Sequence, residues 1–355
     1  MAEIVRWLMT APDAPLERVV AAVPVPGPGQ ALVEVAGCGV CHTDLGFYYE
    51  GVRTRAPLPL ALGHEVSGFV RAAGAGAEHL IGQAVVVPAV LPCGDCEHCL
   101  AGRGTVCARQ FMPGNDGHGG FASHLLVPAR GLCPVPGCSD ADQELGQPGL
   151  TLRSLSVLAD AASTAYQAVV RASLEPGGAV VVVGAGGVGI YAVQLARHFG
   201  ARVIALDVDP ARREQALALG ADKALDAAAD RRSLRSEVKA FVAGSRGGVR
   251  VFECSGHPGG QELAFELLGP AGVLLVVGFT STKVSIRLSR LMALDAQAIG
   301  NWGCLPEHYP TLLELVRSGA VAVAPLCETF PLDDVQQVLE AVRAHRIHGR
   351  PVLIP

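Results

Sequence analysis

The sequence lacks a hydrophobic run long enough to cross a membrane. Half of its 355 residues are hydrophobic, but no apolar stretch approaches the roughly 20 residues that a transmembrane helix needs. The opening residues, MAEIVRWLMT, form too short an apolar stretch, with the wrong flanks, for a secretory signal. We therefore expect a cytoplasmic protein with no membrane partner.

A strong excess of charge of one sign is also missing. The chain has 28 lysine and arginine residues against 33 aspartate and glutamate residues, and its formal net charge is −5 at pH 7. Proteins that bind nucleic acid usually carry a clustered positive charge. The composition therefore argues against nucleic acid as the main partner. It leaves a globular chain with room for two domains.

The pattern of secondary structure changes along the chain. Over the first 140 residues, runs such as QALVEVAGCGV, SGFVRAAG and QAVVVPAV are separated by Gly and Pro and indicate β-strands. From residue 179, buried strands alternate with helices, which is typical of a parallel doubly wound sheet. The tail contains two helical segments and a last strand, GRPVLIP. We predict a β-rich domain over 1–160, a nucleotide-binding domain over 161–300, and a return to the first domain over 301–355.

A glycine-rich loop, VVVVGAGGVG, follows the first strand of the second domain. Its glycines fit G-x-G-x-x-G, with a buried strand before them and an amphipathic helix after them. Such a loop permits a tight turn, close approach of the backbone to a pyrophosphate and close helix–strand packing. The residues that we expect to bind a dinucleotide here are Gly184, Gly186, Gly187, Val188 and Gly189. The alternative is that the glycines serve only as turn residues in a fold that binds no nucleotide.

The next strand ends in a carboxylate. Asp207 closes VIALDVD, at the distance from Gly189 where an acidic residue usually binds the adenosine ribose. A carboxylate would repel a 2′-phosphate, so Asp207 favours NAD over NADP. Arg212 lies five residues further on and could contact the ribose of NAD or accept a phosphate.

Four cysteines are closely spaced in CGDCEHCLAGRGTVC. Cys93, Cys96, Cys99 and Cys107 form a C-x2-C-x2-C-x7-C array. Four thiolates complete the tetrahedral shell of a structural zinc ion, and the short gaps let the chain turn back on one ion. An iron–sulfur cluster also takes four thiolates and is the alternative. Because the protein supplies all four ligands, this site would stabilise the fold and leave no position for substrate.

Two further fragments, GVCHTD and GHE, complete a recognisable set. Cys41 in GVCHTD, His64 and Glu65 in GHE, the four-cysteine array and the glycine loop occur in the same order as in the medium-chain, zinc-dependent alcohol dehydrogenases. The chain resembles this family over essentially its whole length. The resemblance implies a GroES-like catalytic domain joined to a Rossmann domain, NAD as cofactor, two zinc ions per chain, and a homodimer or homotetramer.

The resemblance also implies a catalytic zinc ion held by Cys41, His64 and a third ligand just before the nucleotide domain. At that position most relatives have cysteine, whereas this chain has Asp160. A carboxylate donates less charge to the metal than a thiolate, so the ion should be a stronger Lewis acid. Alternatively, Asp160 only caps a helix beginning near Ser163. By resemblance, Glu65 either lies behind the zinc or moves in as a ligand.

The same resemblance implies a route for the substrate proton. Thr43 occupies the position of the family's Ser or Thr that takes the alcohol proton, and His42 the position that faces the cofactor phosphates. Many relatives pass the proton to a histidine five residues after the cysteine, where this chain has Gly46. A water or the cofactor's ribose hydroxyl would then release the proton.

Three segments resemble one branch of the family most closely: FYYEGVRTRAPLPLALGHE, ARQFMPGNDGHGGFASHLLVPARGLCPV and LSVLADAASTAYQAVVRA. This branch oxidises 6-hydroxycyclohex-1-ene-1-carbonyl-CoA to the 6-oxo product, with NAD as acceptor, in anaerobic benzoyl-CoA degradation. A CoA thioester substrate would need cations near the cleft mouth. The candidates are Arg53, Arg55, Lys283, Arg287 and Arg290. The alternative is a general secondary-alcohol or polyol dehydrogenase. A non-catalytic zinc- and nucleotide-binding protein should lack Cys41, His64 or Asp160, and none is missing.

Overall fold

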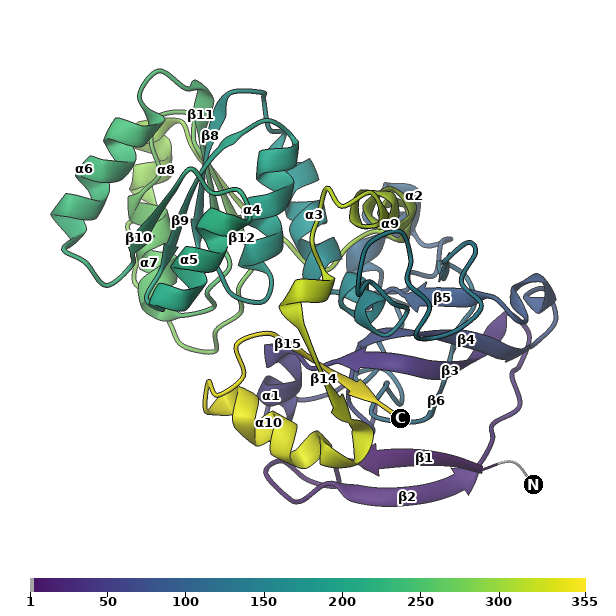
Figure 1. Cartoon of the computed structure of the whole chain (residues 1–355). Helices are drawn as coiled ribbons and strands as arrows, with labels where there is room; N and C mark the ends of the chain where they lie inside the picture. The colour runs from purple at the N-terminus through teal and green to yellow at the C-terminus, as the bar shows by residue number, and fades with distance from the viewer. Residues whose placement is uncertain (1–2) are drawn as a thin grey trace. The chain divides into compact units, whose positions relative to one another are not determined.

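The computed structural model describes residues 3–355, which form two compact units (Figure 1). Unit 1 contains the chain up to Ser163 together with 303–355, and unit 2 contains 164–302. The sequence analysis set these boundaries at 160 and 301. In the structure the first boundary, after Ser163, falls inside helix α3 (Ala161–Ala172), and the Ser163 hydroxyl is hydrogen-bonded to that of Tyr309, which also belongs to unit 1. Within residues 3–355, no helix combines the length and the apolar character needed to span a membrane.

Unit 1 is built on antiparallel β-structure. Its strands are β1 (Glu3–Leu8), β2 (Glu17–Ala22), β3 (Gln30–Gly39), β4 (Glu65–Ala73), β5 (Ala84–Val87), β6 (His124–Pro128), β7 (Cys133–Pro134), β14 (Cys327–Pro331) and β15 (Arg350–Ile354). The main sheet has the order β14-β15-β3-β4-β5-β7, with β6 also paired to β3, and β1 pairs with β2 separately. The last strand of the chain therefore lies beside β3.

The helices of unit 1 lie between and after these strands. They are α1 (His42–Tyr49), α2 (Glu97–Leu100), α9 (Tyr309–Arg317) and α10 (Val335–Arg343), with a 3-10 helix, η3 (Ser154–Ala159), just before α3. Buried residues of β3, β4, β5, α1 and α10 form one apolar core. Exposed and buried residues alternate only weakly along β3 and β4. Both faces of these central strands are covered, which leaves few positions for polar residues.

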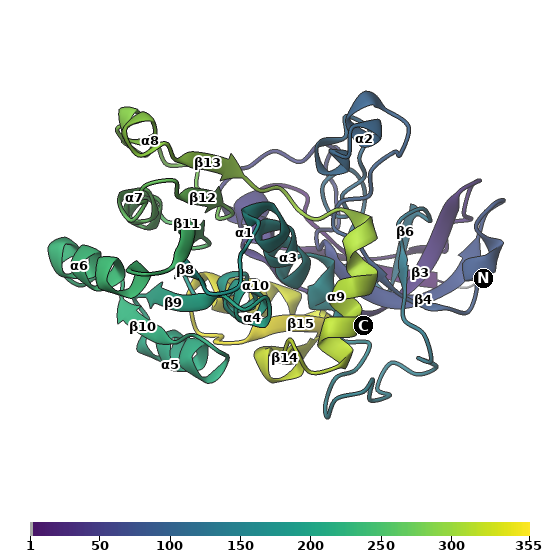
Figure 2. The same cartoon turned by 90° about the horizontal axis from the view of Figure 1, so that it is seen from above.

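Unit 2 is a parallel sheet flanked by helices on both faces (Figures 1 and 2). Its strands are β8 (Gly178–Val183), β9 (Arg202–Asp207), β10 (Lys223–Asp226), β11 (Arg246–Glu253), β12 (Val273–Val276) and β13 (Gln297–Gly300). Its helices after α3 are α4 (Gly189–His198), α5 (Pro210–Ala218), α6 (Arg231–Val242), α7 (Pro258–Glu266) and α8 (Ser289–Leu294). The sheet order is β10-β9-β8-β11-β12-β13. The order reverses between β8 and β11, and ligands of open α/β sheets bind at the carboxyl ends of strands at such a point.

Candidate metal centres and cofactor site

The four cysteines of the predicted structural site converge in space. Their sulfur atoms all lie within 4.8 Å of one another, with Sγ–Sγ distances of 3.5 Å for Cys96–Cys99, 3.6 Å for Cys96–Cys107 and 3.9 Å for Cys93–Cys99. Four thiolates at about 2.3 Å from one zinc ion lie about 3.8 Å apart at the corners of a tetrahedron. A cluster of several irons, each with its own thiolate, would hold the sulfurs further apart. The geometry therefore fits a single ion.

Backbone groups around this site are arranged to stabilise thiolates. The N–H of Cys93 and that of Arg109 both donate to Cys107 Sγ at 3.3 Å, and the N–H of Gly94 donates to Cys99 Sγ at the same distance. The pKa of Cys96 is lowered to about 6, chiefly by a hydrogen bond from the backbone of Cys99, whereas a hydrogen bond with Asp95 raises the pKa of Cys93 to about 12 and burial raises that of Cys99. Thiolates are the form that zinc binds.

The second group brings together Cys41, His64 and Asp160, which come from three separate segments. Cys41 precedes α1, His64 precedes β4, and Asp160 lies between η3 and α3. Asp160 Oδ2 is 3.4 Å from His64 Nε2 and 3.8 Å from Cys41 Sγ. Ligand atoms at about 2.0–2.3 Å from a tetrahedral zinc ion are about 3.3–3.8 Å apart. The carboxylate therefore points where a third ligand would be needed.

His64 offers an observation that favours a cation at this point. Its side chain is buried, and Nε2 makes no hydrogen bond among residues 3–355. A buried imidazole nitrogen without a hydrogen bond is costly unless it binds something that the protein chain does not supply. Burial, the largest single influence, lowers the pKa of His64, but the charge of Asp44 and the side-chain contacts with Asp160, Asp44 and Cys41 together outweigh it and raise that pKa well above its usual range. The surroundings thus favour positive charge, which a metal ion would provide.

Asp44 is a site residue that the sequence analysis missed. It is buried; Oδ2 accepts from the N–H of Cys41 at 2.9 Å, and Oδ1 accepts from the N–H of Gly63 at 3.1 Å. Oδ1 also lies 3.5 Å from His64 Nδ1, so the carboxylate orients the imidazole with Nε2 toward Asp160. The signal was present, because Asp44 is three residues after Cys41, the spacing of a carboxylate that caps a helix start.

Gly63 shows why glycine precedes His64. Its φ is +94°, and a Cβ atom there would lie 2.7 Å from both Cys38 Sγ and a ring carbon of Phe121. Another residue would be strained by the backbone conformation and would clash with buried neighbours. The turn that places His64 therefore depends on glycine.

Glu65 is engaged by Arg350 in a buried ion pair. The Nε of Arg350 donates to Glu65 Oε2 at 2.9 Å, and its Nη2 donates to Oε1. One carboxylate oxygen nevertheless lies within 4.8 Å of the other three potential ligands. In this conformation Glu65 fits the position behind the metal, and direct ligation stays a prediction. Arg350, at the start of β15, had no local sequence signal because it is far along the chain from Glu65.

The remaining predicted residues of unit 1 lie on α1. Thr43 is partly exposed, with Oγ1 at 3.7 Å from Cys41 Sγ. His42 is exposed, and its ring centroid lies 6.5 Å from that of His345. Gly46 provides no side chain that could carry a proton.

In unit 2 the glycine loop connects β8 to α4, as predicted. Gly184 has φ of +86°, and a Cβ atom there would lie 2.7 Å from Ser255 Cα; a Cβ atom on Gly189 would lie 1.8 Å from the Gly184 carbonyl oxygen. These two positions therefore require glycine. Gly187 is exposed, and Val188 directly precedes the helix. The loop lies at the carboxyl end of β8, beside the reversal of strand order.

Asp207 ties this loop to the end of β9. Oδ2 accepts from the N–H of Ala185 at 2.8 Å, and Oδ1 accepts from the N–H of Asp209 at 2.9 Å. The side chain of Arg212 lies over Gly186, because a Cβ atom there would be 3.1 Å from Nη1. The carboxylate and the guanidinium therefore both lie beside the glycine loop.

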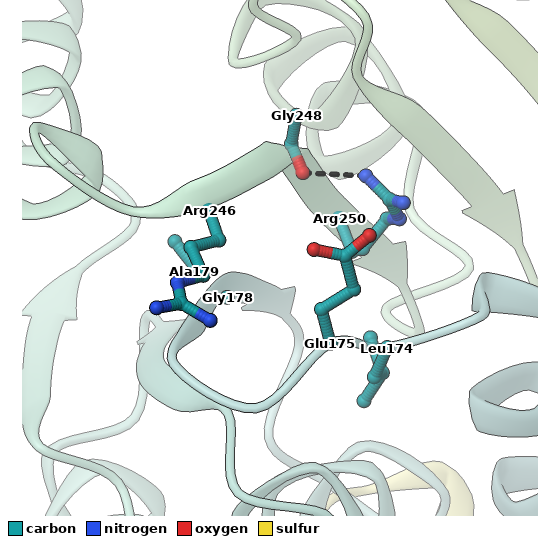
Figure 3. Close-up of a pocket in the computed structure, with 7 residues that line it drawn as sticks. All are labelled: Leu174, Glu175, Gly178, Ala179, Arg246, Gly248 and Arg250. Carbon is teal, nitrogen blue, oxygen red and sulfur yellow. Dashed lines mark hydrogen bonds between the residues drawn. The ribbon is translucent and has the colours of Figure 1, made fainter.

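A small cavity in unit 2 lies elsewhere (Figure 3). It is lined by residues at the starts of β8 and β11, among them Arg246 and Arg250, and by Glu175. Its volume of about 10 Å³ has room for a single water. The glycine loop follows the last residue of β8, at the carboxyl ends of the strands. The cavity lies at their amino ends and is therefore no part of the predicted cofactor site.

The cations suggested for a CoA substrate differ in their surroundings. Arg290 donates to the carbonyl oxygens of Glu266 and Leu268, so its guanidinium is used at the end of α7. Arg55 lies 3.4 Å from Asp116. The other three, Arg53, Lys283 and Arg287, are exposed. These surroundings give no specific indication of a CoA site.

Two family models and several known proteins match this chain. Residues 27–137 match the model of the alcohol dehydrogenase GroES-like domain, and residues 187–318 match that of the zinc-binding dehydrogenases. The chain is 30% identical to an L-threonine 3-dehydrogenase of Pyrococcus furiosus over 96% of both chains, and 29% identical to an alcohol dehydrogenase of Geobacillus stearothermophilus over 92% of this chain and 91% of that one.

A solved structure extends the comparison to the fold. The NAD complex of acetophenone reductase from Geotrichum candidum has a TM-score of 0.85 and 26% identity, covering 99% of this chain and 97% of that one. The fold is therefore the two-domain arrangement of a GroES-like domain and a Rossmann-type parallel sheet. The chain belongs to the medium-chain, zinc-dependent alcohol dehydrogenases, enzymes that oxidise CH–OH groups with NAD(P).

Proposed function

We propose that this protein is an NAD-dependent dehydrogenase of secondary alcohols or polyols, with Cys41, His64 and Asp160 as ligands of a catalytic zinc ion. The observation that carries the proposal is the buried His64 Nε2, which has no hydrogen bond among residues 3–355 and lies 3.4 Å from the Asp160 carboxylate. When bound, zinc would supply Lewis acidity that lowers the pKa of a substrate hydroxyl, and NAD would accept the hydride.

The chain's own residues then have separate roles. Asp44 holds the imidazole of His64 in one orientation, and the Glu65–Arg350 pair places a second buried carboxylate close behind the ligands. Thr43 Oγ1 takes the hydroxyl proton of the substrate through a hydrogen bond. Because Thr43 is partly exposed and Gly46 has no side chain, the proton leaves through water or through the cofactor's ribose hydroxyl.

The preference for NAD rests on Asp207. Its carboxylate is at the end of β9 and bonded to the glycine loop, so its negative charge would lie near the adenosine ribose. A 2′-phosphate at this position would be repelled. Arg212 would contact the ribose or the pyrophosphate from the other side of Gly186.

The relatives support a free secondary alcohol or polyol as substrate better than they support a CoA thioester. The names of two of them concern carbon 3 of L-threonine, which bears a secondary hydroxyl, and acetophenone, whose reduction gives a secondary alcohol. A CoA thioester finds no support among these relatives, and Arg290, one of its candidate cations, is used within unit 2. We therefore prefer the small secondary alcohol or polyol.

The test is a substrate panel with NAD reduction as the readout. It contains secondary alcohols, polyols, L-threonine, and 6-hydroxycyclohex-1-ene-1-carbonyl-CoA with its free acid. We expect the highest kcat/KM with a free secondary alcohol or polyol. Activity confined to the CoA thioester would overturn the preferred substrate class, and no NAD reduction with any hydroxyl compound, in protein with two zinc ions, would overturn the proposed chemistry.

A further inference from the structure

Asp160 occupies a position that regular secondary structure does not determine. The 3-10 helix η3 ends at Ala159, and α3 begins at Ala161, so Asp160 belongs to neither helix. Its carboxylate must nevertheless point at Cys41 and His64 for the three groups to share one ion. Small rotations of the peptide before Asp160 would move the carboxylate away from them.

The carbonyl group of Ala159, directly before Asp160, is tethered from several directions. It accepts a hydrogen bond of 3.0 Å from the N–H of Ala89, a residue that follows β5. It also accepts from the hydroxyl of Tyr309 at 2.6 Å, at the start of α9. The Ser163 hydroxyl, in the first turn of α3, lies 3.0 Å from the Tyr309 oxygen and 3.2 Å and 3.3 Å from the carbonyl oxygens of Asp160 and Ala159, and can donate to any one of them.

These hydroxyl groups are completely enclosed. Tyr309 is 1% exposed, and Ser163 is fully buried. Hydrogen bonds in such surroundings are not weakened by competing water, so they fix geometry better than surface bonds do. Tyr309 belongs to the segment that returns to unit 1 after unit 2, and nothing in the local sequence around Asp160 indicates it.

We propose that Tyr309 and Ser163 are positioning residues for the metal ligand Asp160, holding its backbone so that the carboxylate faces Cys41 and His64. The inference rests on the proposed metal site and deepens it. Tyr309 touches neither substrate nor metal; it acts through the Ala159 carbonyl. Groups that orient metal ligands typically change metal affinity by about 10–100-fold when they are removed.

The experiment compares zinc retention in three variants and the wild-type protein. Tyr309→Phe and Ser163→Ala each remove one hydroxyl. Tyr48→Phe is the matched control, because Tyr48 is also 1% exposed in unit 1 and its hydroxyl donates to the Ala14 carbonyl at 2.6 Å. Each protein is loaded with zinc and equilibrated with increasing chelator, and the zinc remaining per chain is measured.

We expect Tyr309→Phe to release one zinc ion at about tenfold lower chelator concentration than the wild type. Ser163→Ala should shift in the same direction, whereas the zinc of the four-cysteine site stays bound in both. Tyr48→Phe should match the wild type at both sites. Cobalt exchanged into the catalytic site should show a changed absorption spectrum in Tyr309→Phe and an unchanged one in Tyr48→Phe.

Two results would overturn this inference alone. One is a wild type with two zinc ions and a Tyr309→Phe variant with unchanged zinc retention and cobalt spectrum. The other is equal zinc loss in Tyr48→Phe, which would mean that any loosening of unit 1 releases the metal. A wild type that binds only the zinc of the four-cysteine site would overturn the proposed function, and this inference with it.

Discussion

His64 Nε2 and Asp160 Oδ2 lie 3.4 Å apart, within a group that also contains the thiol of Cys41. The three side chains come from three segments, and a different feature of the fold places each one. The imidazole is held by Asp44, the thiol belongs to the residue before α1, and the carboxylate follows a tethered peptide. The first prediction concerns the carboxylate.

Asp160→Ala should lose the catalytic zinc and nearly all activity, because one of three ligands is removed. The zinc of the four-cysteine site and the fold should survive, since that site uses none of the same residues. Asp160→Cys should restore metal binding with a changed rate, because a thiolate donates more charge and leaves a weaker Lewis acid. Metal-to-protein ratios and turnover check both variants. If Asp160 were only a helix cap, its loss would cost about 1 kcal/mol of stability and leave two zinc ions in place.

Asp44→Asn should weaken the catalytic zinc site without removing a ligand. Asparagine keeps one oxygen for the N–H of Cys41 but loses the negative charge beside His64 Nδ1. We expect zinc affinity at this site to fall by about 10–100-fold. Competition with a chelator measures it, and the four-cysteine site in the same molecule serves as the control. Equal retention of both ions in this variant and the wild type would contradict the role assigned to Asp44.

Asp207→Gly should reduce the preference for NAD over NADP. The negative charge that repels a 2′-phosphate is removed. The bond to Ala185 is also lost, so the affinity for both cofactors should fall and the ratio of the two kcat/KM values is the informative quantity. Asp226→Ala is a matched control, because Asp226 pairs in register with Asp207 on the adjacent strand β10. A wild-type protein equally efficient with NADP would count against the assignment.

Glu253 should make stability depend on pH. It is fully buried at the end of β11, and burial raises its pKa above the ordinary value of 4.5, although Oε1 accepts from the N–H groups of Ser255 and Gly256. Between pH 4.5 and the folded-state pKa, the folded protein therefore keeps a proton on Glu253 that the unfolded chain has already lost. The stability due to this group is present below pH 4.5 and is lost as the pH rises through the folded-state pKa.

Glu253→Gln removes this ionisation while keeping the shape of the side chain. Its stability relative to the wild type should therefore rise as the pH is raised from about 4.5. Midpoints of urea unfolding at several pH values measure the difference. Glu214→Gln, at an exposed position on α5, is the control and should show no such trend. A difference that stays constant over the whole range would argue against ionisation of Glu253 as the cause.

Much of the site could be predicted where the chemistry is local. The spacing of Cys93, Cys96, Cys99 and Cys107 lets one short segment surround an ion, and the glycine loop follows directly on its strand. In both cases the interacting atoms are close along the chain, so few conformations of the rest of the protein matter. The alternation of buried strands and helices in unit 2 was predictable for the same reason.

The catalytic group was predictable only in part. Cys41, His64 and Asp160 were picked out because the chain resembles a family, since no spacing rule connects residues so far apart. The sequence did not reveal whether Glu65 lies behind the metal or ligates it. That depends on Arg350, which reaches Glu65 only because β15 pairs with β3 and β3 pairs with β4.

The sequence by itself thus determined the elements, the four-cysteine array, the nucleotide loop and the family. Only the tertiary structure decided what surrounds each catalytic ligand: Asp44 beside His64, Arg350 on Glu65, and Tyr309 above the peptide before Asp160. The physical reason is that these contacts are buried hydrogen bonds and ion pairs between segments that meet only in the folded protein, and for Arg350 and Tyr309 only when the chain's last segment returns to unit 1. The local sequence around one partner therefore does not indicate the other, although the spacing of Asp44 after Cys41 does indicate its role at the start of α1.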